Sequence, residues 1–121
     1  MSMFDHVGLR VHDLAASCRF YEAVLAPLGF VAGPRGDDYA GFGPPGAPSL
    51  WLHLHDFPRL TGCHVAFSAK TPEAVQAFHA AGLREGGRDN GAPGPRPAYS
   101  ESYYAAFLID PDGNNVEAVR A

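Results

Sequence analysis

The stretch Ile109-Asp-Pro-Asp-Gly-Asn-Asn-Val-Glu-Ala-Val119 predicts a β-hairpin at the end of the chain. In its turn, Asp110-Pro-Asp-Gly113, proline presets φ, the aspartates can accept hydrogen bonds from nearby backbone N–H groups, and glycine allows a positive φ. Apolar-rich runs flank the turn at Tyr103–Ile109 and Val116–Val119. Glu117 stands out because its neighbours in the strand favour burial, and a buried carboxylate is costly unless it is paired or bound to a metal. A partner for Glu117 must therefore come from elsewhere in the chain.

The composition is that of an ordinary globular protein. A length of 121 residues with 46% hydrophobic residues predicts one domain, residues 1–121, with a sizeable core. No apolar run approaches the roughly 20 residues of a membrane helix, and the first residues lack the pattern of a signal peptide. The net charge of −4 and the absence of a basic cluster argue against nucleic acid. Cys18 and Cys63 match no CxxC pattern, which indicates free thiols and a cytoplasmic location.

The first half of the chain predicts a strand, a helix and three further strands. Alternation predicts a strand over Phe4–Val11, and apolar residues at helical spacing predict a helix over Leu14–Leu25 with Asp13 as its N-cap. Residues 29–48 are rich in glycine and proline and predict short strands and turns. Ser49–His55 alternates again and predicts a strand.

The second half begins with the same pattern. Cys63–Ala69 predicts a strand, and Thr71 followed by proline predicts a helix that runs to about Ala81. Its apolar markers are Val75, Phe78 and Leu83. The stretch Arg88–Ser102 carries so many glycines and prolines that it predicts a long loop, and long loops in compact domains are usually functional.

The sequences of the two halves of the chain align with each other without a gap. The alignment places His6 on His64, Leu9 on Phe67, Phe20 on Phe78, Leu25 on Leu83 and Gly29 on Gly87. Such self-similarity predicts an α+β fold of two pseudo-symmetric βαβββ modules, module one at about residues 1–60 and module two at about residues 61–121. Their strands are expected to form a paired sheet.

The repeat also predicts a metal site. His6 and His64 occupy equivalent positions on the first strand of each half, and Glu117 could join them on a shared concave face. Two imidazoles and one carboxylate suit Fe(II), Ni(II), Mn(II) or Zn(II). The alternative is that both histidines are half-exposed strand residues and that Glu117 is a solvated charge. The coincidence of the three residues with the repeat favours the metal.

The chain resembles the vicinal oxygen chelate superfamily, which contains glyoxalase I, bleomycin resistance proteins and extradiol dioxygenases. Three stretches carry the resemblance: Asp5-His-Val-Gly-Leu-Arg-Val11 with the residues that follow it, His64-Val-Ala-Phe67, and Asp110-Pro-Asp-Gly-Asn-Asn-Val-Glu117. The resemblance implies a cupped, partly open eight-stranded sheet around a divalent metal, usually in a homodimer. The family's metal positions fall on His6, His64 and Glu117.

The chain departs from this family at two positions. Glyoxalase I-like members carry a fourth ligand, commonly glutamate, where this chain has Trp51; His53 lies two residues further on the same face. Without that carboxylate the usual base of glyoxalase-type proton transfer is missing. Extradiol dioxygenases resemble one another in a tyrosine at the position of Phe107. The resemblance therefore leaves the reaction open.

Further residues are predicted to line a binding cavity. Trp51, His53, Arg96, Tyr99 and either Tyr103 or Tyr104 could stack on and charge-pair with a small aromatic or anionic ligand. Ordinary strand packing explains the tyrosines equally well, and a solvated loop charge explains Arg96 equally well.

Other candidate side chains are predicted to have no part in the site. His12, His55 and His79 are interpreted as residues of the surface or of a helix face, with His79 pointing to solvent, and Cys63 as a buried small hydrophobe.

Two functions are compatible with this pattern. The first is a divalent-metal-dependent enzyme of the isomerase, lyase or oxygenase type, acting on a small oxygen-chelating substrate. The second is a metal-free small-molecule or drug-binding protein of the bleomycin resistance type. Retention of His6, His64 and Glu117 favours the first, and Trp51 in a ligand position favours the second.

Overall fold

The computed structural model describes residues 3–56 and 62–121, so the predicted boundary between the modules, near residues 60 and 61, lies outside the described residues. The elements of module one are β1 (Val7–Val11), α1 (Leu14–Leu25), the 3₁₀ helix η1 (Ala26–Leu28), β2 (Val31–Arg35), β3 (Tyr39–Gly43) and β4 (Leu50–Leu54). Those of module two are β5 (His64–Ser68), α2 (Pro72–Arg84), β6 (Arg88–Pro95), β7 (Tyr104–Ile109) and β8 (Asn115–Arg120).

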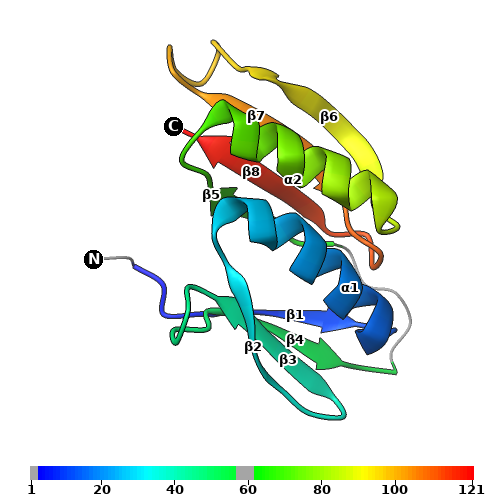
Figure 1. Cartoon of the computed structure of the whole chain (residues 1–121). Coiled ribbons are helices and arrows are strands. Elements are labelled where there is room, and N and C mark those ends of the chain that lie inside the picture. The colour runs from blue at the N-terminus through cyan, green and yellow to red at the C-terminus, as the bar shows by residue number, and fades with distance from the viewer. Residues whose placement is uncertain (1–2, 57–61) are drawn as a thin grey trace.

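The prediction of two equivalent βαβββ modules is confirmed. Each module forms a four-stranded sheet, in the order β1-β4-β3-β2 and β5-β8-β7-β6 (Figure 1). In each sheet the first strand pairs in parallel with the last, β1 with β4 and β5 with β8, and the remaining pairs are antiparallel. The same chain path is thus used twice, and the last strand of each module lies next to the first.

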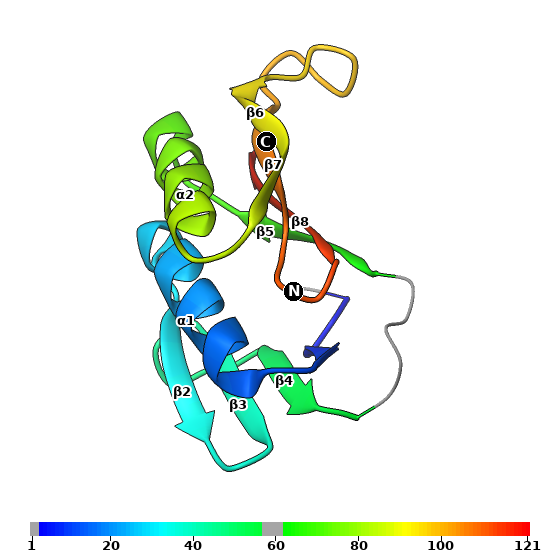
Figure 2. The same cartoon turned by 90° about the vertical axis from the view of Figure 1, so that its right-hand side faces the viewer.

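The two helices pack side by side, and each covers one face of its own sheet (Figure 2). Asp13 and Thr71 cap them as predicted, because their side chains accept hydrogen bonds from the backbone N–H groups of Ala16 and Ala74. Phe20 and Phe78, which the repeat aligns, are fully buried in one core that joins both modules. Each sheet therefore keeps one face that the helices leave uncovered.

The helices also bear on the question of membrane insertion. Within the described residues, no helix combines the length and the apolar character that crossing a bilayer requires.

The turn Asp110–Gly113 joins the modules as well as its own two strands. Locally it has the predicted form: Gly113 has a φ of 93°, and Asp110 Oδ1 accepts hydrogen bonds from the N–H groups of Asp112 and Asn114. Asp110 Oδ2 also accepts a hydrogen bond from the hydroxyl of Tyr21 in α1. The turn that closes the hairpin of module two is therefore anchored in the core of module one.

Asp112 makes a second connection of the same kind. Its Oδ1 accepts the backbone N–H of His12 at 2.9 Å, and its Oδ2 accepts the hydroxyl of Ser17 at 3.0 Å. The sequence predicts only local bonds for these aspartates, so the link between modules is a finding of the structure.

The prediction of a loop over Arg88–Ser102 is wrong for its first part, because residues Arg88–Pro95 form β6. This strand lies at the edge of its sheet, pairs with β7, and shifts register twice. Proline is tolerated at an edge because a missing N–H there breaks no ladder bond, so Pro93 does not prevent strand formation.

Leu83 also differs from its predicted place on the apolar face of the helix. It is 47% exposed near the end of α2, whereas Leu25, which the repeat aligns with it, is buried. The two helices are thus not equivalent in their last turn.

Candidate functional site

Glu117 lies on the uncovered face of the module two sheet, in the central strand β8. Its side chain is 3% exposed, while Val116 and Ala118 on either side are fully buried. Glu117 Oε2 accepts a hydrogen bond of 2.5 Å from the hydroxyl of Tyr103, and Oε1 lies 3.1 Å from His64 Nε2. The carboxylate that the sequence singles out is thus partnered by a phenol and an imidazole.

His64 is oriented by a second contact. Its Nδ1 lies 3.1 Å from the backbone oxygen of Asn115, and its Nε2 faces Glu117. Both contacts can be hydrogen bonds at once only when the ring is protonated; a neutral ring donates from one nitrogen and presents a lone pair at the other. A neutral His64 that donates from Nδ1 therefore aims the Nε2 lone pair at the carboxylate, which is the usual orientation of a metal-ligating histidine.

Phe107 and Arg96 extend this cluster across the sheet. Phe107 is the cross-strand partner of Glu117, and its ring stacks near that of His64 with 6.3 Å between ring centroids. The guanidinium of Arg96 lies over the same ring, with Cζ 5.5 Å from its centroid. We call His64, Tyr103, Phe107, Glu117 and Arg96 the module two cluster.

The Tyr103 hydroxyl keeps its proton over a wide pH range. The hydrogen bond to Glu117, together with burial, raises the pKa of Tyr103 to about 12. Because this value is above the ordinary pKa of about 10, the interaction stabilises the fold fully below pH 10 and is lost as the pH rises through 12. Tyr103 is therefore a hydrogen-bond donor and not a base at neutral pH.

This elevated pKa gives a spectroscopic prediction. In an ultraviolet titration of folded protein, Tyr103→Phe is expected to remove a tyrosine ionisation with a midpoint near pH 12, whereas Tyr99→Phe, which leaves the Tyr103–Glu117 bond in place, keeps that phase. A Tyr103→Phe curve that superimposes on the wild-type curve at high pH would show that the bond does not form.

His6 lies apart from the other two predicted metal ligands. It precedes β1, its side chain is 59% exposed, and its Nδ1 lies 2.8 Å from Asp5 Oδ1. Within residues 3–56 and 62–121, no group of three or more His, Cys, Asp or Glu side chains is placed to hold a metal ion. The structure thus brings together two of the three predicted ligands, His64 and Glu117.

Trp51 and His53 lie on the sheet of module one. Trp51 packs flat on the backbone, because a Cβ added to Gly41 would lie 2.6 Å from its ring, and Tyr39 lies beside it with ring centroids 6.3 Å apart. His53 is exposed and packs near Gly8. These side chains form an aromatic surface separate from the module two cluster.

The two remaining tyrosines of the predicted cavity differ in position. Tyr104 packs against the core, and its hydroxyl accepts a hydrogen bond from Gln76 of α2, so it lies on the helix-covered face. Tyr99 is 67% exposed and packs edge-on against Tyr103, with centroids 5.0 Å apart. Of these two, Tyr99 adjoins the module two cluster and Tyr104 does not.

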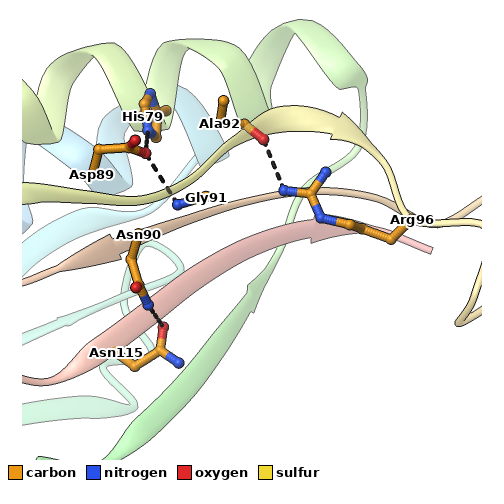
Figure 3. A network of polar contacts seen from close by, with 7 residues as sticks. All are labelled: His79, Asp89, Asn90, Gly91, Ala92, Arg96 and Asn115. Carbon is orange, nitrogen blue, oxygen red and sulfur yellow. Dashed lines mark hydrogen bonds and ion pairs between the residues drawn. The ribbon is translucent and has the colours of Figure 1, made fainter.

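The prediction that His79 points to solvent is wrong. Its side chain is buried and its Nε2 lies 2.9 Å from Asp89 Oδ1, a contact that lowers the pKa of Asp89 (Figure 3). The same Asp89 oxygen accepts the N–H of Gly91, and Asn90 donates to the side chain of Asn115. The contact between His79 and Asp89 therefore connects β6 to α2, and the bond between Asn90 and Asn115 connects β6 to β8.

Cys63 also differs from its prediction as a buried small hydrophobe. The residue is exposed, immediately before β5. The first core residue of that strand is therefore not Cys63.

Sequence reasoning did not assign Phe107 to the site. The sequence did contain one indication: Phe107 lies four residues after Tyr103 in the predicted strand, and residues four apart in a strand share a face. The opposing glycine, Gly91, could not be paired with Phe107 from the sequence because β6 was not expected to be a strand.

Comparison with known proteins agrees with this architecture. Residues 3–118 match the model of the Glyoxalase/Bleomycin resistance protein/Dioxygenase superfamily. A crystal structure of a glyoxalase/bleomycin resistance protein from Albidiferax ferrireducens T118 is 34% identical, with a TM-score of 0.89 over 99% of this chain and 100% of that chain. The V278E glyoxalase I mutant from Zea mays is 28% identical, with a TM-score of 0.71 over 95% of this chain and 44% of that one.

More distant structures share the fold alone. One is a glyoxalase/bleomycin resistance protein/dioxygenase family enzyme from Burkholderia phytofirmans PsJN, at 19% identity, with a TM-score of 0.74 over 96% of both chains. A search of curated proteins gives no match. The match of the family model over nearly the whole chain and the 34% identity to a complete relative show that the chain belongs to the glyoxalase/bleomycin resistance protein/dioxygenase superfamily.

Proposed function

We propose that the uncovered face of module two binds a divalent metal ion and a small oxygen-bearing substrate, and that the protein is a metal-dependent enzyme of the isomerase, lyase or oxygenase type. The observation that carries this proposal is the buried Glu117 carboxylate, 3.1 Å from His64 Nε2. Two ligands at right angles, each about 2.1 Å from one ion, stand about 3.0 Å apart, so the pair fits two neighbouring coordination positions.

His64 and Glu117 would hold the ion, which would supply Lewis-acid chemistry to a substrate oxygen. Tyr103, whose O–H points at Glu117 Oε2, orients the carboxylate and holds its own proton at neutral pH. Phe107, the cross-strand neighbour of Glu117, would supply an apolar wall beside the ion. These roles need no proton transfer by Tyr103.

The third ligand would be His6 of a second copy. In the described part of one chain, His6 pairs with Asp5 and forms neither a hydrogen bond nor an ion pair with Glu117 or His64. β1 and β5, the strands next to these histidines, are both edge strands in the described sheets. A homodimer that sets module one of one copy against module two of the other would join all three residues.

The test is the metal content of protein purified without a metal-affinity tag. After incubation with Fe(II), Ni(II), Mn(II) or Zn(II) and removal of free ion, we expect about one ion per chain in the wild type and a loss of most of it in Glu117→Ala. His64→Ala, at a half-exposed position that does not threaten folding, is expected to behave like Glu117→Ala. Glu73→Ala, an exposed carboxylate in the first turn of α2, is the matched control and keeps the metal.

A second function is favoured by the Trp51 surface. Trp51 occupies the position of the family's fourth ligand and, with Tyr39, offers an aromatic platform to a flat ligand. Under this alternative the protein sequesters a small molecule without a metal. Absence of bound metal from the wild type with all four ions would reject the enzyme proposal in favour of this one.

A further inference from the structure

Arg96 carries a positive charge onto the same face as Glu117 and His64. Its Cζ lies 5.5 Å from the centre of the Phe107 ring, and that ring neighbours both residues. Among the described residues, no acidic side chain lies within ion-pair distance of Arg96. Glu117 itself is already partnered by Tyr103 and His64, so the charge on Arg96 is not matched within the cluster.

The guanidinium is held in place by uncharged groups. Nη1 donates to the carbonyl oxygens of Gly94 at 2.9 Å and Pro95 at 3.3 Å. Nη2 donates to the carbonyl oxygen of Ala92 at 2.8 Å, as Figure 3 shows. These carbonyls fix the plane of the group without neutralising it. Arginine has five N–H donors, so in the described structure the N–H of Nε and one N–H of Nη2 remain available.

The backbone of β6 is shaped to admit this side chain. A Cβ added to Gly91 would lie 2.9 Å from Phe107 Cδ1 and 3.4 Å from Arg96 Nη2, and one added to Gly94 would lie 3.4 Å from Nη1. A larger residue at position 91 would therefore press on the Phe107 ring, whereas one at position 94 would only touch the guanidinium. The bond between His79 and Asp89 secures the start of the same strand.

We propose that Arg96 is the anion-binding residue of this face and that the ligand is a small molecule carrying a carboxylate. The available N–H groups of Nε and Nη2 lie along one edge of the guanidinium and form the two-donor fork that matches a carboxylate. The body of the ligand then lies beside the apolar edge that Phe107 adds to the cluster. This inference rests on the proposed function for its choice of face, and it names the class of substrate.

The experiment measures binding of benzoate by calorimetry, with benzamide as the neutral analogue of the same shape and phenylphosphonate as the other oxyanion. The wild type is expected to bind benzoate saturably and at least about tenfold more tightly than benzamide. Arg96→Gln is expected to weaken benzoate binding by about tenfold or more, because a charged hydrogen-bonded pair is lost. Arg84→Gln, an exposed arginine in the last turn of α2, makes the same charge change on the helix side and is the control.

Arg96→Lys keeps the charge without the fork and is expected to bind benzoate more weakly than the wild type. If Arg96→Gln shows no thermal unfolding transition and is therefore unfolded, the benzoate affinity of Arg96→Lys is the test of the proposal. Unchanged benzoate affinity in the Arg96 variants, benzamide that binds as tightly as benzoate, or no saturable benzoate binding by the wild type would overturn the proposal. Tighter binding of phenylphosphonate than of benzoate would overturn the carboxylate assignment in favour of a phosphoryl ligand.

The titrations are made on chelator-treated protein and repeated after loading with Ni(II). Loss of benzoate binding in Arg96→Gln with an unchanged metal content supports the anion site by itself. A protein that binds benzoate through Arg96 yet holds no metal would refute the metal-dependent function and leave this inference standing.

Discussion

Replacing Asp110 with alanine is expected to lower the free energy of unfolding by about 3–5 kcal/mol. Asp110 is 3% exposed and accepts hydrogen bonds from the Tyr21 hydroxyl, the side chain of Asn114, and the backbone N–H groups of Asp112 and Asn114. Alanine leaves these donors without their acceptor at a position that is 3% exposed. The loss is a large part of the roughly 5–15 kcal/mol that stabilises a typical domain.

Urea unfolding monitored by the fluorescence of Trp51 measures this effect. Tyr21→Phe removes one of the donors and is expected to cost less, about 1–2 kcal/mol. Asp37→Ala, at an exposed carboxylate between β2 and β3, is the control and should change stability little. An Asp110→Ala variant as stable as the Asp37→Ala variant would show that the turn does not anchor the two modules.

Burial and the carboxylate of Asp110 raise the pKa of Tyr21 well above its ordinary value. Tyr21 therefore keeps its proton and remains a donor at neutral pH and through its ordinary pKa of about 10. Because the pKa of Tyr21 is raised in the folded state, the contribution of this hydrogen bond to stability is fully present below the ordinary pKa and is lost only as the pH rises through the raised value. The hydrogen bond between Tyr21 and Asp110 therefore joins module two to module one at neutral pH.

Mixing two variants that each fail to bind the metal is expected to restore metal binding if the site is shared between two copies of the chain. His6→Ala and Glu117→Ala each lack one predicted ligand, so neither should retain the ion alone. In a heterodimer of the two, His6 from the second variant meets His64 and Glu117 from the first, which completes one of the two sites. Random pairing in an equal mixture makes about half of the dimers heterodimers. Because each heterodimer has one complete site of two, about one quarter of all sites are complete.

The measurement is metal content after the two variants are unfolded together, refolded and freed of unbound ion. The control is the same treatment applied to each variant alone, which should leave both without metal. If wild-type protein retains metal and the mixture retains none, the three ligands meet within a single chain and the shared site is wrong. Metal retention by His6→Ala alone would instead remove His6 from the ligand set.

Much of the architecture follows from the sequence alone. The helices and most strands were predictable because alternation, helical spacing, capping by Asp13 and Thr71, and the turn chemistry of Gly113 act between residues a few positions apart. The repeat then fixed the equivalence of the two modules, since the same local pattern directs the same chain path twice. Glu117 could be singled out because a charge between buried neighbours conflicts with its surroundings.

Only the tertiary structure decided what surrounds these residues. The partners of Glu117, the burial of His79 against Asp89, and the strand at Arg88–Pro95 all depend on which distant segments lie side by side. Register and packing between elements are set by the whole core, and no local pattern encodes them. For this reason the sequence identified His64 and Glu117 as candidates, whereas the fold determined that they meet and that His6 of the same chain pairs with Asp5 instead.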